Sequence, residues 1–313
     1  MEREPVEISR IARLYGLNEK TLHRQYKTHL SGFKEAEMPE DLLYRFNLGK
    51  RLSIDDTGLI GKDGNTVIGN KDTGQIVALV QGTKAAKVVE LVSQIPFRER
   101  LKVEEISLDF CGSYDWATRT LFPSAIKTID RFHVQQLVND AMQSVRTRHR
   151  WATLKAAAEA KDSGQRQHRQ ANGETSTELL ARGRYLLFTP RDRWTASQRE
   201  RAAVLFESYP EIAEAYKISQ ALRTIYEGRH SVSEAKALLD DWYRQTRGSR
   251  IDEFVTCVKT IRSHEGRVLN YFINRDTNAF AESMNAKLKQ FKRMCRGIRD
   301  PKFFLFRVGL YFA

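Results

Sequence analysis

The stretch RLSIDDTGLIG, residues 51–61, is where the sequence changes from helical to extended patterning. Leu52 and Ile54 alternate with other residues, as side chains on the buried face of a β-strand do. The strand runs straight into two consecutive aspartates, Asp55 and Asp56, and a glycine marks the turn that follows. The pattern therefore predicts a strand that carries carboxylates to its own carboxyl end.

The segments after this strand continue the extended pattern and then alternate it with helices. In order, the periodicity predicts a strand at 65–68, a strand at 75–80, a helix at 84–95, a strand at 103–108, a helix at 114–122 and a strand at 125–129. A meander that continues into strands separated by helices is the element order of the ribonuclease-H-like fold. A doubly wound sheet is the weaker alternative, because the first three strands lack crossover helices.

Two of the later strands also end in an aspartate. Asp109 closes the strand at 103–108, and Asp130 closes the strand at 125–129 within the string IDRFHV. In the ribonuclease-H-like topology the first and fourth strands are neighbours. We therefore expect Asp55 and Asp109 to lie close together although they are far apart in the sequence.

A long helical block interrupts this α/β pattern. The clearest helices are predicted at 197–206, 212–226, 232–243 and 251–263, and the polar stretch 162–177 is interpreted as an exposed basic loop or ragged helix ends. The predicted organisation is a helix-turn-helix module at 1–33, a linker with a short helix at 34–50, the first part of the mixed-sheet core at 51–133, a large all-helical insertion at 134–270 and the completion of the core at 271–313.

The stretch DTNAFAESMNAKLKQFKR, residues 276–293, supplies the last helix that the fold needs. At about 100° per residue, its apolar side chains fall on one stripe and a polar set falls on another. The apolar stripe is Ala281, Met284, Leu288 and Phe291, and the polar one is Asn278, Glu282, Asn285 and Lys289. One face is expected to pack while the other presents a lone carboxylate among amides and cations. A solvated charged face is the alternative interpretation.

Residues 7–33 predict two short helices joined by a glycine. The residues at helical spacing are Ile8, Ile11, Ala12, Leu14 and Tyr15 before the glycine, with Leu22 and Tyr26 inward after it. In a helix-turn-helix the second helix enters the major groove, so Lys20, Arg24 and Lys27 are candidates for DNA contact. An ordinary helical hairpin explains the same pattern equally well.

The composition indicates a polyanionic partner. The 313 residues carry a net charge of +13 with a pI near 9.7, and each cation laid against a phosphate releases a condensed counterion. The three cysteines are far apart and form no Cys-x-x-Cys pair, which argues against a disulfide framework or a zinc ribbon and fits a reducing cytosol. No apolar run approaches the roughly 18 residues that span a bilayer. We expect a cytoplasmic, nucleoid-associated protein without a membrane partner.

Asp55, Asp109 and Glu282 form a candidate metal site. Carboxylates at short range raise one another's pKa unless a cation neutralises them. Magnesium suits such a site because it takes oxygen ligands and keeps waters that phosphate oxygens can replace. Two such ions roughly 4 Å apart would serve phosphoryl transfer, which is the chemistry of DNA strand cleavage and joining.

Several strings in this chain carry a resemblance when they are taken together and in order. They are IDD at 54–56, LDFCGSY at 108–114, DRFHV at 130–134, YLLFTPRDRWT at 185–195 and TNAFAESMNAKLKQFKR at 277–293. From about residue 51 onward the chain resembles the bacterial insertion-sequence transposases of the IS-L-three family. The resemblance implies a DDE transposase that uses Mg²⁺, with Mn²⁺ as a substitute, and that cuts element ends and joins them to target DNA. By matching position, Asp55, Asp109 and Glu282 are its three acids.

The resemblance gives secondary roles to neighbours of these acids. Asp56 is either a partner of the metal-binding residues or simply the next residue of the turn. Asp130 and His133 match an Asp-x-x-His pattern seen in several transposase groups, and His133 either contacts DNA beside the cut or caps a helix. Asn278 and Asn285 would orient the third acid or hold DNA, unless they only make the helix face polar.

The resemblance also names partners for the chain. Basic residues expected to follow the DNA backbone, unless they form a solvated face, are Lys287, Lys289, Lys292, Arg293, Arg296 and Arg299. Trp151 and Trp194 are either stacking platforms for an unpaired base or ordinary core residues. The expected partners are double-stranded DNA at the element ends and the target, a second copy of the chain in the active complex, and a second polypeptide for end recognition.

Two rival functions fit the same residues. A nuclease of the same fold would cut DNA without joining it. A helix-turn-helix regulator would bind DNA and use its acids only for structure. A joining assay separates the first rival from a transposase, and the positions of the three acids in space bear on the second.

Overall fold

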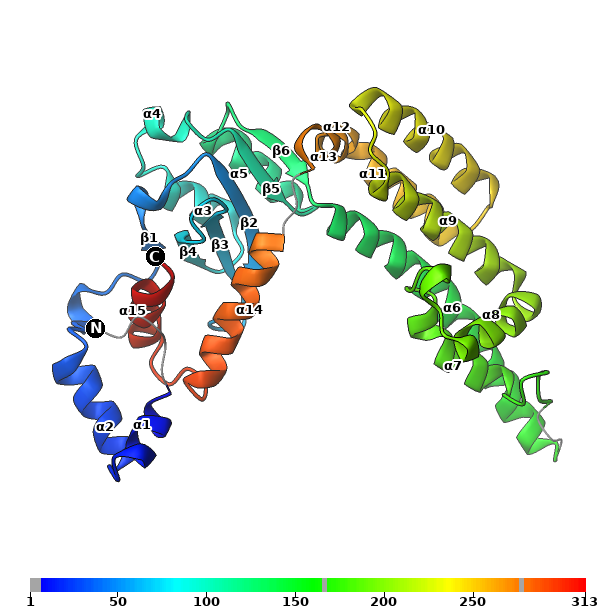
Figure 1. Cartoon of the computed structure of the whole chain (residues 1–313), viewed down its shortest axis with the longest axis horizontal. Helices are drawn as coiled ribbons and strands as arrows, with labels where there is room; N and C mark the ends of the chain where they lie inside the picture. The colour runs from blue at the N-terminus through cyan, green and yellow to red at the C-terminus, as the bar shows by residue number, and fades with distance from the viewer. Residues whose placement is uncertain (1–6, 165–167, 276–278) are drawn as a thin grey trace. The chain divides into compact units, whose positions relative to one another are not determined.

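The computed structural model describes residues 7–164, 168–275 and 279–313 and divides into two compact units (Figure 1). The first unit combines Met1–Asp130 with Asp276–Ala313, and the second is Arg131–Arg275. The first unit is therefore built from two separate parts of the chain. No helix in the described ranges is both long and apolar enough to cross a membrane.

A six-stranded mixed sheet forms the centre of the first unit, in the order β1-β4-β3-β2-β5-β6. Its strands are β1 (Leu42–Leu43), β2 (Arg51–Thr57), β3 (Asn65–Asn70), β4 (Ile76–Gln81), β5 (Glu105–Leu108) and β6 (Ile126–Ile129). Strands β2, β3 and β4 form an antiparallel meander, while β5 and β6 run parallel to β2. This is the predicted order, including the pairing of the first and fourth predicted strands, and it is consistent with a ribonuclease-H-like core.

Strand β1 was not predicted. It lies in the stretch expected to be a linker and pairs antiparallel with β4. Two residues are too few to show the alternation that identifies a strand. Leu42 is nevertheless buried, so contact with the sheet, rather than a local pattern, orders this segment.

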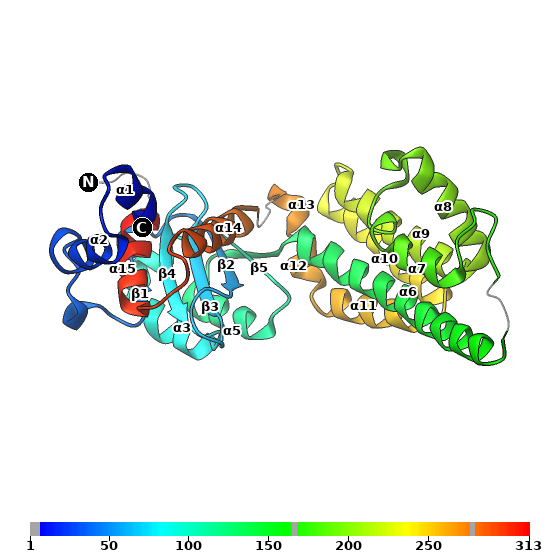
Figure 2. The same ribbon diagram turned by 90° about the horizontal axis from the view of Figure 1, so that it is seen from below.

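Helices cover both faces of the sheet. They are α3 (Ala85–Val92), α4 (Phe97–Arg100), α5 (Gly112–Leu121), α14 (Ala279–Met294) and α15 (Pro301–Phe312). Leu52 and Ile54 of β2 pack in one apolar cluster with residues of α3 and α5. Val67 of β3 packs in the opposite cluster with Met284 and Leu288 of α14. Figure 2 shows α3 and α5 on one side of the strands and α14 on the other.

The N-terminal residues form α1 (Ile8–Leu14), α2 (Glu19–Gln25) and a π-helical turn (Tyr26–Leu30). The predicted pair of helices is present, but the structure does not establish a helix-turn-helix module. Leu14 and Tyr15, which helical spacing grouped with the packed residues, are exposed. The reason is that this pair has little core of its own, since α1 buries only Ser9 and Ala12. Short 3-10 turns follow at Glu35–Glu37 and Arg45–Asn47.

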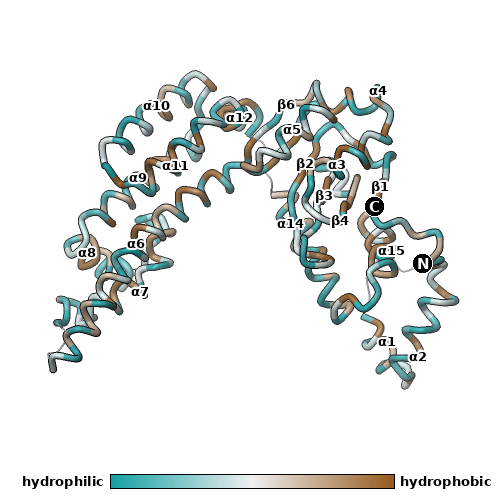
Figure 3. The backbone as a smooth tube through the Cα atoms, turned by 180° about the vertical axis from the view of Figure 1, so that it is seen from behind, coloured by the Kyte–Doolittle hydropathy of each residue, from teal (hydrophilic) through white to brown (hydrophobic). Residues whose placement is uncertain are grey.

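The second unit is helical throughout, as predicted. Its helices are α6 (Arg131–Asp162), α7 (Ser176–Leu186), α8 (Ala196–Ser208), α9 (Pro210–Glu227), α10 (Val232–Gly248), α11 (Asp252–Ser263), α12 (Glu265–Leu269) and α13 (Tyr271–Asn274), with a 3-10 turn at Arg191–Arg193. Helix α6 is the central element, and α7, α9 and α11 pack against it. Apolar residues recur along α6 in Figure 3 and include Val134, Val138 and Met142, all fully buried.

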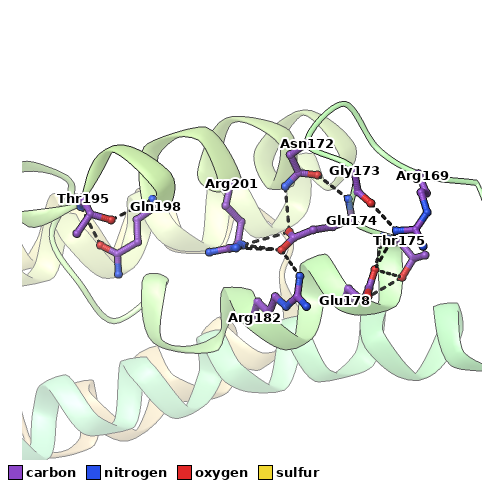
Figure 4. Close-up of polar contacts among 10 residues, drawn as sticks. All are labelled: Arg169, Asn172, Gly173, Glu174, Thr175, Glu178, Arg182, Thr195, Gln198 and Arg201. Carbon is purple, nitrogen blue, oxygen red and sulfur yellow. Dashed lines mark hydrogen bonds and ion pairs between the residues drawn. The ribbon is translucent and has the colours of Figure 1, made fainter.

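The prediction of an exposed loop at 162–177 is wrong for its last part. Glu174 is only 6% exposed, and its carboxylate accepts hydrogen bonds from Arg182 at 2.8 Å, Arg201 at 2.9 Å and Asn172 at 2.9 Å (Figure 4). Burial alone would raise the pKa of Glu174, but the hydrogen bonds from Arg201, Arg182 and Asn172 lower it to about 2. The polar sequence around Glu174 does not indicate this cluster, because the two arginines that bind Glu174 lie on α7 and α8.

Candidate active site

The carboxyl ends of β2 and β5 bring two acids to equivalent positions on neighbouring strands. The parallel register pairs Ser53 with Ser107, and Asp55 and Asp109 each follow two residues later. Two residues return a side chain to the same face of a strand, and adjacent strands are about 4.8 Å apart. Asp55 lies in β2 and Asp109 directly follows the last residue of β5, so both acids lie at the same edge of the sheet.

Backbone amides and one amide side chain hold these two carboxylates. Asp55 Oδ1 accepts from the Asp56 backbone N–H at 2.9 Å, and Asp55 Oδ2 accepts from Asn285 Nδ2 at 2.8 Å. The Asn285 amide also reaches the Asp56 carbonyl at 3.4 Å. Asp109 Oδ1 accepts from the Cys111 backbone N–H at 2.7 Å. Hydrogen bonds thus orient both oxygens of Asp55 and one oxygen of Asp109, and Asp55 contacts α14 directly.

Helix α14 packs against β2 and β3 and carries Glu282 on the flank opposite Phe280. Three contacts give its direction: a side chain at Gly69 of β3 would collide with the Phe280 ring, Asn285 contacts Asp55, and Lys292 Nζ donates to the Leu59 carbonyl at 2.7 Å. At 100° per residue, Phe280 and Glu282 lie on opposite sides of the buried stripe. Phe280 lies over β3, and Glu282 lies on the opposite flank of α14.

Glu282 itself is exposed. It precedes Asn285 by three residues, so the two are neighbours on the helix surface. Within the described parts of the chain, no group of three or more His, Cys, Asp or Glu side chains lies close enough to hold a metal ion. The structure therefore carries Asp55 and Asp109 at the ends of neighbouring parallel strands, while Glu282 is exposed on α14, within one helical turn of the Asp55–Asn285 contact.

Asp56 points to the opposite face from Asp55, toward α5. Its carboxylate accepts a short hydrogen bond from the Tyr114 hydroxyl group, and Thr66 Oγ1 lies 3.1 Å from Asp56 Oδ1 and 2.8 Å from the Tyr114 oxygen. Desolvation raises the pKa of Asp56, and the charge of Asp109 adds to that effect, while the two hydroxyl groups oppose it. Burial raises the pKa of Tyr114 as well, so its hydroxyl stays a donor. Asp55, and not Asp56, lies on the face of β2 that packs against α14.

Sequence reasoning did not identify Tyr114 or Thr66 as members of this site. Tyr114 closes the string LDFCGSY, but a tyrosine on the buried side of a helix normally indicates core packing. Thr66 lies on β3, opposite Asp56 in the antiparallel register. No local signal marks either residue, because their relation to Asp56 depends on strand pairing and on how α5 packs.

The remaining predicted site residues lie in several places. Asp130 is buried at the end of β6, one position beyond the Leu108–Ile129 pair, and its backbone N–H donates to the Leu108 carbonyl at 3.2 Å. His133 lies in the first turn of α6, in the second unit. Asn278 lies outside the described residues. Trp194 is buried, with its indole N–H donating to the carbonyls of Leu186 and Thr189, whereas Trp151 is exposed.

The predicted DNA-binding residues divide into exposed and engaged groups. Lys20, Arg24, Lys287, Lys289 and Arg293 are exposed. Lys27 contacts Asp300, Lys292 donates to backbone carbonyls after β2, and Arg296 pairs with Glu19 at 3.1 Å. The engaged cations hold α2 and α14 in place, which leaves the exposed set as the more available surface for a polyanion.

The amino-acid sequence of the chain is similar to sequences of known proteins. A family model described as a transposase of the ISL3 type matches residues 52–308. Two curated proteins, each a transposase for insertion sequence element IS1557 from a strain of Mycobacterium tuberculosis, CDC 1551 and H37Rv, are 24% identical to the chain over 245 residues. The match covers 76% of this chain and 54% of each relative, so the chain spans about half the length of the curated relatives it matches. No solved structure matches the chain.

Proposed function

The chain belongs to the IS-L-three family of DDE transposases, and on that premise we propose that it cuts the ends of an insertion sequence and joins them to target DNA. The single observation that supports this most strongly is the parallel pairing of β2 with β5, because Asp55 and Asp109 lie where these two neighbouring strands end. The same strand order supports a ribonuclease-H-like core. The exposed cations of α2 support a DNA-binding role for the N-terminal helices.

The acids suit the divalent metal ions on which DDE transposases generally depend. Carboxylate oxygens are the donors that Mg²⁺ prefers, and Mn²⁺ would substitute because it favours the same oxygen ligands. When bound as a pair, such ions would activate an attacking oxygen and stabilise a leaving one. Asp55 and Asp109 would hold them from the sheet, and Glu282 would complete the set by turning from the rim of α14 toward them.

The neighbouring residues would position these ligands and the DNA. Asn285 holds Asp55 against α14, and the Cys111 backbone N–H holds Asp109. Asp56 accepts hydrogen bonds from Tyr114 and Thr66, and these would fix the end of β2 on the face of the sheet that α5 covers. Lys287 and Lys289 share the exposed surface of the helix that carries Glu282, so they would contact the DNA backbone beside the reacting phosphate.

A joining assay tests the proposed function. Purified protein is incubated with Mg²⁺, a duplex that carries the DNA flanking its gene, and a supercoiled plasmid as target. We expect products in which a 3′ end of the duplex is joined to the plasmid, detected by sequencing across the junction. Cleavage without joining would indicate a nuclease instead, and DNA binding without either reaction would indicate a regulator.

Removal of the Asn285 amide is expected to weaken metal binding. Asn285→Ala leaves Asp55 without the hydrogen bond that orients it, and loss of such a supporting contact typically costs about 10- to 100-fold in metal affinity. The measurement is the Mn²⁺ concentration that half-saturates DNA cleavage, which should rise by that factor. Gln290→Ala, on the exposed side of the same helix, is the matched control. An unchanged midpoint in Asn285→Ala would contradict the orienting role.

A further inference from the structure

A pocket of about 250 Å³ lies in the first unit at the far end of α14. It is lined by Ile8, Ser9, Glu19, Lys20, His23, Met294, Cys295, Arg296, Arg299 and Arg307. Met294 is 12 residues beyond Glu282, which is about 18 Å along a helix at 1.5 Å per residue. The pocket is therefore separate from the candidate active site. Its walls come from the N-terminal helices on one side and from α14 and α15 on the other.

Arg307 is the buried cation of this pocket. It is only 5% exposed, its Nη1 donates to Cys295 Sγ at 3.2 Å, and its Nε is buried with no hydrogen-bond partner. The guanidinium lies over the rings of Phe291 and Tyr26. In the described parts of the chain no carboxylate pairs with Arg307. A buried charge without a counterion costs free energy. An anion bound beside Arg307 would offset that cost.

Ser9 provides a second unsatisfied group on the same pocket. It is 3% exposed, and its hydroxyl group has no hydrogen-bond partner. A hydroxyl is both a donor and an acceptor, and a buried one without a partner costs free energy. Ser9 comes from α1 and Arg307 from α15, so two elements far apart in the sequence each leave a donor unused at one pocket.

The other charges around the pocket are mainly positive. Lys20, Arg299 and His23 line it and form no ion pair with any residue that the structure describes, while Arg296 pairs with Glu19, the one acid in the described lining. Desolvation lowers the pKa of His23, and the charges of Arg307 and Arg299 lower it further. Desolvation is the largest cause, and the smaller contributions of Arg307 and Arg299, which Asp300 opposes, reflect the positive potential that an anion would experience there.

We propose that this pocket binds a phosphate group, held by Arg307 and Ser9 with Arg299 and Lys20 at its mouth. An arginine fork and a hydroxyl donor are the groups that recognise phosphate oxygens. One water occupies about 30 Å³ in the liquid, so 250 Å³ has room for a phosphate and part of its hydration. The phosphate comes either from a DNA backbone or from a free phosphate ion.

A phosphate at this position would link the N-terminal helices to the C-terminal ones. Lys27–Asp300 and Glu19–Arg296 already join the same elements, but they lie on partly exposed side chains. A ligand that contacts Ser9 and Lys20 from one side and Arg307 and Arg299 from the other would strengthen that junction. If the ligand is a DNA phosphate, the pocket is an anchor for DNA remote from the reacting bond, and this part rests on the proposed function.

Inorganic phosphate alone tests the site. Replacement of chloride by phosphate at constant ionic strength is expected to raise the Tm of the full chain by about 2 to 4 °C when phosphate is well above its Kd. Arg307→Met, Ser9→Ala and Arg299→Gln should each reduce the rise, and the last, at an exposed residue, should fold normally. Arg100→Met is the matched control, since Arg100 is also buried but donates to the carbonyls of Ile95 and Leu121. A rise that persists in the three variants, or its absence in the wild type, would overturn the proposal.

Measurements of DNA affinity at several salt concentrations distinguish the two sources of the phosphate. If a backbone phosphate occupies the pocket, Arg299→Gln should lower the slope of log K against log salt by about one for a duplex, and inorganic phosphate should compete with the duplex. If the thermal shift is present and the slope is unchanged, the pocket takes free phosphate. Neither measurement involves DNA cleavage, so failure of the transposase proposal and failure of this one are distinguishable.

Discussion

Asp55→Asn and Asp109→Asn are expected to reduce DNA cleavage and joining by about a thousandfold or more. Each change replaces a carboxylate with a neutral amide at the edge where β2 and β5 end. Loss of a metal-binding carboxylate removes several kcal/mol of transition-state stabilisation, and each 1.36 kcal/mol is tenfold in rate. Single-turnover cleavage of an end-bearing duplex in Mg²⁺ measures the effect. Glu282→Gln should reduce cleavage and joining by a similar factor if Glu282 is the third metal-binding acid.

The controls separate loss of chemistry from loss of binding. Asp63→Asn removes an exposed carboxylate from the loop between β2 and β3 and should leave the rate unchanged. DNA affinity of the three acid variants should stay equal or rise, because each removes a negative charge from a surface that meets a polyanion. Full activity in Asp109→Asn would exclude the two-acid site. Activity in Glu282→Gln with none in the other two would assign the third ligand to another residue.

Glu174→Gln is expected to lower the free energy of unfolding of the helical unit by about 3 kcal/mol at neutral pH. The carboxylate of Glu174 is buried between Arg182 and Arg201, and removal of one partner from a buried ion pair typically costs about 3–5 kcal/mol. Glutamine keeps the shape but not the charge, so it imitates the protonated acid. Urea unfolding followed by circular dichroism measures the change, with Glu200→Gln on the exposed side of α8 as the control. A loss equal to that of the control would show that the cluster is not stabilising.

The same group predicts a pH dependence with a defined sign. The pKa of Glu174 is about 2 in the folded protein, below its ordinary value of 4.5. The unfolded chain therefore binds this proton at higher pH than the folded one, and the stabilisation is present above pH 4.5 and lost as pH falls toward 2. The stability difference between wild type and Glu174→Gln should stay constant from pH 7 to about 5 and shrink below that. A difference that is constant down to pH 3 would contradict the assignment.

The α/β core was predictable because its signals are local. Alternation in 51–57, the turns between the next strands and the apolar stripe of 279–294 each reflect the periodicity of one element. The order of the strands predicts the pairing of β2 with β5, which the structure confirms, and the proximity of Asp55 and Asp109 stays a prediction. The sequence predicts Glu282 on the polar face of this helix, and the structure leaves its side chain exposed on α14.

Features that depend on distant partners were not predictable. Glu174 was taken for part of an exposed loop because its arginine partners lie on two different helices. Leu14 and Tyr15 have the spacing of packed residues, yet the residues that α1 buries are Ser9 and Ala12, and both Leu14 and Tyr15 are exposed. The choice of Asp55 over Asp56 rested on the resemblance alone, whereas in the structure Asp55 faces α14 and Asp56 faces Tyr114.

The sequence by itself determined the order and type of the elements of the sheet, the positive charge of the chain and the identity of its candidate acids, because these depend on neighbouring residues and on counting. Only the tertiary structure decided which face each acid occupies, which cations are already engaged and where Arg307 and Ser9 meet. The physical reason is that burial and pairing are properties of surfaces brought together by packing. The residues that flank a position in the sequence do not indicate whether it is buried or paired.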